Sequence, residues 1–302
     1  MHHPATESTV ARDIVATGRG LHTGRRVRVR VCPAPAGSGI CFRRRGRGGG
    51  TVSIPALWGN RVSQPMCTAL QAEDGTLVRT VEHLLAALLA FGVDNARVEL
   101  DAEELPILDG SAGPWCELLR EAGVETQDAG RRVIRVTGRF CHRQDNRRIC
   151  VEPSGRPVID VTMDLRGFGS MHWRGEPTAE VFCHEIAPAR SFGRVKWALP
   201  AKLAGLIGRR PVLRGAHLGN VAPVWGGRIL GGMRLPDEPV RHRVLDLLGD
   251  LALAGRPIIG RVTALRPGHE MNHAFLSRLM QREDLWEEVL LPSTTAGPHQ
   301  TL

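Results

Sequence analysis

The chain has 302 residues, of which 42% are hydrophobic, and a formal net charge of +9. This length can support one large globular domain or two of about 150 residues each. The longest fully apolar run, Leu84–Phe91, is far shorter than the ~20 residues of a transmembrane helix, and the N-terminus has no apolar stretch of secretory type. We therefore expect a soluble cytoplasmic protein whose functional site does not include Met1–His3.

Arginine supplies nearly all of the positive charge, because Lys196 and Lys202 are the only lysines. The densest basic run, Arg43–Arg47, could neutralise phosphates. However, it has no interleaved aromatic residues, and aromatics make up only 4% of the chain. We expect a solvated loop at this run and no nucleic-acid partner; anionic lipid or a polyanionic substrate is the alternative.

The cysteines give no sign of a disulfide framework or of a thiolate zinc site, because their number is odd and none forms a C-x-x-C pair. We expect reduced and mostly buried thiols. The seven positions are Cys32, Cys41, Cys67, Cys116, Cys141, Cys150 and Cys183.

The first half of the chain reads as strands followed by a helix. Alternating valine and arginine in Val27–Val31 predicts a half-buried strand. From Val81 to Leu88 the apolar residues are spaced i, i+3, i+4 and i+7, which predicts a helix that ends at Gly92. The remaining predicted segments are a strand at Ala96–Leu100, a helix at Gly113–Ala122 and a polar boundary stretch at Glu125–Gly130.

The second half repeats this order. Its predicted segments are strands at Arg132–Thr137 and Val158–Met163, a helix with an apolar face from Val240 to Leu251, and a strand at Ile258–Leu265. Each half thus has a histidine near the start of its helix, His83 or His242. We predict an α+β fold of two similar domains, 1–127 and 128–302, related by an old duplication. Each would be a helix layer packed on a β-sheet, and the helices would face each other across a central cleft.

Two of these helices carry residues suited to a metal ion. His242 and Asp246 are four residues apart, so their side chains leave one helix face about one turn apart. Imidazole and carboxylate together suit zinc, and His83 from the other helix would complete three protein ligands with one position open for water. The neighbouring Glu82 could then serve as general base. From spacing alone, a lone helix histidine such as His83 is more often an ordinary, partly exposed residue than a metal ligand.

His269 and Asp250 are further candidates for proton chemistry. A histidine held by a carboxylate can stay protonated, stabilise an oxyanion and donate a proton to a leaving amine. From spacing alone, a capping or surface role for His269 stays open.

Six blocks of sequence occur in order across most of the chain: Thr17–Gly24, Thr80–Leu84, Leu105–Ala112, Ala189–Gly193, Val240–Leu251 and Gly268–Asn272. In order and spacing they resemble the zinc-dependent UDP-3-O-acyl-N-acetylglucosamine deacetylases of lipid A biosynthesis. The resemblance implies two domains with zinc between them, iron being the alternative metal in the cell. It also implies hydrolysis of the N-acetyl group of a nucleotide-sugar lipid precursor.

The resemblance assigns a role to each catalytic candidate. The metal ligands it implies are His83, His242 and Asp246. Glu82 would be the general base, and His269, oriented by Asp250, would be the general acid or the electrostatic partner of the tetrahedral intermediate. Ser191 stands where the family usually has threonine, and its hydroxyl would hydrogen-bond the substrate carbonyl.

The substrate-binding residues that the resemblance implies are Arg147, Arg243, Arg266, Phe192 and Cys67. Several positions around the substrate depart from the family pattern. The three arginines stand where the family carries lysines. Leu165 stands where the family usually has an aromatic residue that contacts the uracil, and Arg194 stands where an apolar aromatic residue lines the acyl passage. The apolar residues expected to line that passage, or to pack in the core, are Trp197, Leu199, Leu203, Leu206 and Ile207.

We expect a monomer without a transmembrane segment, and transient contact with a membrane is compatible with the acylated substrate. Two alternative functions stay open. One is a divergent paralogue that deacetylates another acylated amino sugar. The other is a catalytically silent protein that binds nucleotide sugars, although intact Glu82 and His269 argue against it.

Overall fold

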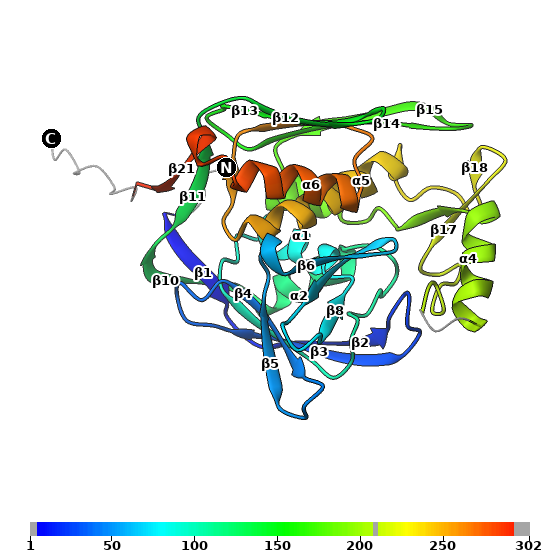
Figure 1. The fold of residues 1–302 in the computed structure, drawn as a ribbon, viewed down its shortest axis with the longest axis horizontal. Coiled ribbons are helices and arrows are strands. Elements are labelled where there is room, and N and C mark those ends of the chain that lie inside the picture. Colours follow the sequence, from blue (N-terminus) through cyan, green and yellow to red (C-terminus); the bar gives the residue numbers. More distant parts are fainter. Residues whose placement is uncertain (1–4, 208–210, 293–302) are drawn as a thin grey trace, which may run out of the picture.

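The computed structural model describes residues 5–207 and 211–292, so Met1–His3 lie outside the described residues. Two five-stranded sheets form the outer layers, and four helices lie between them (Figure 1). The helices are α1 (Glu82–Ala90), α2 (Gly113–Ala122), α5 (Glu238–Leu251) and α6 (His269–Met280). The predicted α+β fold, with helices facing each other between two sheets, is confirmed.

The two large sheets have the same topology. The first has the order β2 (Ile14–Arg19), β3 (Arg26–Pro33), β9 (Ala96–Leu100), β4 (Ile40–Arg45) and β5 (Thr51–Pro55). The second has the order β12 (Phe140–Gln144), β13 (Arg147–Glu152), β20 (Arg261–Leu265), β14 (Val158–Leu165) and β15 (Gly169–Gly175). In both, only the third and fourth strands of this order pair in parallel. This shared topology supports the predicted duplication.

Shorter elements complete the fold. The small sheets are β1 (Thr6–Val10) with β10 (Val124–Gly130); β6 (Arg61–Gln64), β7 (Cys67–Gln71) and β8 (Leu77–Arg79); β11 (Arg132–Val136), β19 (Ile258–Ile259) and β21 (Trp286–Leu290); and β16 (Phe192–Arg194), β17 (Ala222–Trp225) and β18 (Arg228–Ile229). The remaining helical segments are α3 (Ala179–Val181), the π-helical Phe182–Ile186, α4 (Val195–Ile207) and the short turns Trp58–Asn60, Ala252–Ala254 and Glu283–Leu285. No helix among the described residues is long and apolar enough to span a membrane.

Several local predictions are wrong. The segment predicted as one strand, Ile258–Leu265, is split at Gly260 between two sheets. A Cβ at that glycine would lie 2.9 Å from a methyl group of Val136, so the crossing needs glycine. The basic run Arg43–Arg47 was expected to be a loop. Its first part instead belongs to strand β4, where Arg43 and Arg45 pair with residues of β5.

The prediction of reduced thiols also fails at one pair. Cys141 and Cys150 form a disulfide, because the register of β12 and β13 places them directly opposite each other with 4.1 Å between their Cα atoms. Their separation of nine residues gives no such signal in the sequence. The other five cysteines are free.

The backbones of the central helices α1 and α5 come into close contact at Gly249. A Cβ on Gly249 of α5 would lie 2.1 Å from the carbonyl oxygen of Glu82 on α1. The two backbones therefore meet without side chains between them at the start of α1. Apolar residues of both halves, such as Leu84 and Val244, belong to one continuous core around this crossing.

Gly249→Ala should therefore push the helices apart. We expect it to lower the free energy of unfolding by about 1–3 kcal/mol, the usual cost of overpacking a core, as measured by urea denaturation. Gly155→Ala is the control, because nothing lies within 4 Å of its added Cβ. Equal stability of Gly249→Ala and the unmodified protein would contradict the close contact.

Candidate metal centre and catalytic site

The crossing of α1 and α5 brings the three predicted metal ligands together. One ligand atom from each of His83, His242 and Asp246 lies within 4.8 Å of the other two. All three side chains are buried, with at most 4% of each residue exposed. The imidazoles of the two histidines meet edge to face, with ring centroids 5.2 Å apart. Neither helix alone holds the whole set, so packing of α1 on α5 creates it.

Neighbouring groups contact each of these three side chains. Nδ1 of His242 lies 3.1 Å from the carbonyl oxygen of Ala189, so a proton on Nδ1 leaves Nε2 free to bind a metal. The backbone of Ser111 lies near His83 and favours its protonated form, against the larger effect of burial on its pKa. Arg243 donates from Nη1 to Oδ2 of Asp246 over 2.8 Å.

The protonation states of the three residues suit a metal. Burial, together with neighbouring His242, lowers the pKa of His83 to about 3, and burial also lowers the pKa of His242. Burial alone would raise the pKa of Asp246, but the neighbouring side chains, with His242 first among them, outweigh this effect and lower that pKa. Neutral imidazoles and an ionised carboxylate are the forms that bind metal ions. The donor set therefore fits a divalent metal such as zinc.

Two proton-transfer candidates lie beside this cluster. Burial raises the pKa of Glu82 to about 8. For His269, burial would lower the pKa, but the carboxylates of Asp250 and Asp246 raise it to about 10. Nδ1 of His269 lies 3.0 Å from Asp250, and its Nε2 lies 3.9 Å from Glu82. The pair thus places a carboxyl group close to a protonated imidazole.

Thr68 and Asn272, to which no sequence pattern assigns this role, hold the pair in place. Oγ1 of Thr68 donates to Asp250 and lies 3.1 Å from Nδ1 of His269, while its backbone N–H donates to Glu82 over 3.1 Å. Asn272 donates to Asp250 over 2.8 Å. Thr68 follows Cys67 on β7, and no spacing in the sequence connects it with α5 or α6.

Glu104 is another residue that the sequence did not single out. Its buried carboxylate accepts hydrogen bonds from the backbone N–H groups of His22 and Thr23, and from the hydroxyls of Thr23 and Thr80. Thr80 has a φ of 58°, in the left-handed region, two residues before Glu82. Glu104 thus ties the Thr17–Gly24 block to the start of α1.

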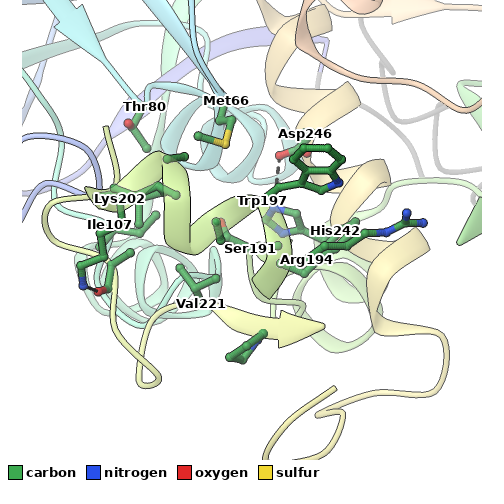
Figure 2. A pocket seen from close by; sticks show the side chains of 18 of the residues that line it. Met66, Thr80, Ile107, Ser191, Arg194, Trp197, Lys202, Val221, His242 and Asp246 are labelled. Atoms are coloured by element: carbon green, nitrogen blue, oxygen red, sulfur yellow. Dashed lines mark hydrogen bonds and ion pairs between the residues drawn. The ribbon is translucent and has the colours of Figure 1, made fainter. Parts of the chain in front are cut away.

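A cavity of about 780 Å³ opens onto the cluster. In Figure 2, His242 and Asp246 lie on one side of this pocket, Lys202 and Ile107 lie on the opposite side, and Ser191 lies between them. The backbone of Ser191 is held on both sides, since its N–H donates to Gly110 and its carbonyl accepts from Ala222.

The predicted substrate-binding residues divide into two groups. Arg147, Phe192 and Arg243 line the cavity, and the Arg243 guanidinium lies over the Phe192 ring at 5.0 Å. Arg266 does not line it and pairs instead with Asp164 at 2.9 Å. Cys67 is fully buried outside the cavity.

The residues near the expected acyl passage are also divided. Arg194, Trp197 and Leu199 line the cavity. The other expected lining residues, Leu203, Leu206 and Ile207, are absent from its wall and exposed on α4, so this part of the prediction is wrong. Leu165, near the expected uracil contact, is buried in the core.

The Asp250 carboxylate should control the charge of His269. In the metal-free protein, Asp250→Asn should lower the pKa of His269 from about 10, measured by NMR titration of the imidazole. Because folding raises the pKa of His269, the protonated imidazole stabilises the folded protein. This stabilisation is complete at pH values below the ordinary pKa of 6.5 and is lost as the pH rises through about 10. An unchanged pKa in Asp250→Asn would show that other carboxylates hold the proton.

Known proteins match this chain along nearly its whole length. The pattern of the UDP-3-O-acyl N-acetylglycosamine deacetylase family matches residues 7–281. The UDP-3-O-acyl-N-acetylglucosamine deacetylase of Syntrophotalea carbinolica is 34% identical, over 98% of this chain and 94% of that protein. That of Myxococcus xanthus is 37% identical over 94% and 89%, and that of Haemophilus influenzae is 35% identical over 98% and 99%. The chain belongs to the UDP-3-O-acyl N-acetylglycosamine deacetylase family.

Proposed function

We propose that the protein removes the N-acetyl group from UDP-3-O-acyl-N-acetylglucosamine in lipid A biosynthesis, with zinc as its metal and ferrous iron as the cellular alternative. One observation carries this proposal: the buried cluster of His83, His242 and Asp246 shares one cavity with Glu82 and His269. The names of the matched relatives supply the substrate, and the cavity supplies the chemistry that an amide hydrolysis needs.

The metal, held by the His83, His242 and Asp246 side chains, would supply a Lewis acid that polarises a carbonyl and lowers the pKa of water. Glu82 would take the proton from the attacking water, since its pKa of about 8 lies near the working pH that favours a general base. His269 carries a proton at neutral pH, so it can stabilise the developing oxyanion and then protonate the leaving amine. Asp250 keeps His269 charged and oriented.

The cavity wall suits an acylated nucleotide sugar. Trp197, Leu199 and Ile107 provide apolar surface for an acyl chain, while Arg147 and Arg243 lie on the same wall and can pair with phosphate. Ser191 would donate its hydroxyl to the substrate carbonyl. The matching strand order of the two sheets supports a division into domains 1–127 and 128–302. We also infer a cytoplasmic monomer.

A divergent substrate is the second candidate. Arg194 lies in the cavity wall, where its charge would alter an acyl passage, and Leu165 is packed in the core rather than free to stack on a base. These two positions favour a paralogue acting on another acylated amino sugar. Assays on nucleotide-linked and free acyl-amino sugars would separate the two functions.

Acetate release tests the reaction, the base and the metal together. Zinc-loaded protein should release acetate from UDP-3-O-acyl-N-acetylglucosamine, and Glu82→Gln should lower kcat by about 10²- to 10⁴-fold, the usual contribution of a general base. Removal of the metal by a chelator should abolish activity, and added zinc should restore it.

Leu57→Gln is the control for Glu82→Gln, because Leu57 is exposed and outside the cavity. A folded, zinc-replete protein that releases no acetate from this substrate would exclude the proposed reaction. Full activity in Glu82→Gln would exclude the proposed base.

The Ser191 hydroxyl can be tested by a matched pair of variants. Ser191→Ala removes the proposed donor to the substrate carbonyl and should lower kcat by about 10²-fold or more, the cost of losing one such donor. Ser191→Thr retains the hydroxyl and should keep most of the activity. Equal kcat values for the Ala and Thr variants would contradict the role.

A further inference from the structure

Exposed apolar side chains concentrate at one end of the molecule. Of the fourteen large hydrophobic residues that are exposed in the described part of the chain, nine lie between positions 197 and 233. They are Trp197, Leu199, Leu203, Leu206, Ile207, Leu218, Trp225, Leu230 and Met233. These positions belong to α4, to the β17–β18 hairpin and to the segments beside them, which Figure 1 shows together at one edge. We call this surface the α4 patch.

The cavity explains only part of this exposure. Trp197, Leu199 and Leu218 line its wall. Leu206 and Ile207 do not, and they are 55% and 89% exposed. The α4 helix is apolar on both its inner and its outer side. Contact with the core does not explain the apolar residues of the outer side, because these residues are exposed. An apolar surface of this extent on a folded protein marks an interaction site.

The same segment carries most of the net charge of the protein. Residues 192–236 contain eight lysines and arginines and no aspartate or glutamate, while the whole chain has a net charge of +9. Both lysines lie here, and Nζ of Lys196 lies 5.0 Å from the ring centre of the exposed Trp197. Arg228, at the hairpin, is also exposed. Two cationic side chains, Lys196 and Arg228, are thus exposed on the same part of the molecule as these apolar side chains.

We propose that the α4 patch binds the surface of anionic phospholipid membranes. Tryptophan and leucine embedded among lysines and arginines are typical of segments that lie in the interface of a bilayer, and basic residues near the surface are attracted to anionic headgroups. A second copy of the chain is a poorer occupant, because two patches of high positive charge would repel each other.

This inference goes beyond the proposed reaction and does not depend on it. The patch adjoins the cavity, since Trp197 and Leu218 belong to both. A protein docked in this way would hold the cavity mouth against the lipid, so an acylated ligand could enter without crossing water.

Vesicle flotation of the full-length chain tests the proposal. The protein should float with vesicles of phosphatidylcholine mixed with phosphatidylglycerol, more weakly with phosphatidylcholine alone, and less as salt increases. The double variant Leu206→Gln/Ile207→Gln should lower the partition coefficient by about tenfold or more, because the transfer of apolar side chains into lipid is lost.

The double variant Leu57→Gln/Val124→Gln is the matched control, since both residues are exposed and lie outside the patch. It should float like the unmodified protein. Absence of flotation with anionic vesicles at low salt would overturn the proposal, as would equal flotation of the patch variant and the control. Self-association that the patch variant abolishes, without lipid binding, would assign the surface to a second copy instead.

Discussion

The close contact of α1 and α5 is the constraint on which the site depends. Gly249 lets the backbone of α5 approach the carbonyl of Glu82, and this contact places the first residues of α1 against three successive turns of α5. His83 then faces His242 and Asp246, and Glu82 lies near Asp250. A larger residue at position 249 would separate the two groups, although every ligand would still be present in the sequence.

Exclusion of water gives these groups their chemical properties. Burial disfavours the charged form of each isolated group, which keeps His83 neutral and raises the pKa of Glu82. The pKa of His269 is raised instead, because the nearby carboxylates of Asp250 and Asp246 outweigh the effect of burial. Neighbouring residues in one small volume thus occupy different protonation states, so metal binding, proton uptake and proton donation can be divided among them.

The periphery of the site follows different rules from its centre. The buried centre requires particular atoms at particular distances, whereas the cavity wall requires apolar surface and positive charge that several residue types can supply. Arg147 and Arg243 line this wall, where a guanidinium can pair with phosphate. The α4 helix combines a cavity wall with an outer apolar face. The outer face and the basic charge of its segment connect the catalytic cavity with a surface suited to lipid.

The sequence by itself determined the main elements and the residues of the candidate metal site, because helix and strand periodicity are local and the six sequence blocks are specific. It could not determine the split at Gly260, the Cys141–Cys150 disulfide, or the roles of Thr68 and Glu104. Strand register and helix packing decide those contacts, and they join residues far apart in the chain. The tertiary structure also decided that Leu206 and Ile207 face outward from the cavity, since an all-round apolar helix carries no signal of which side is covered.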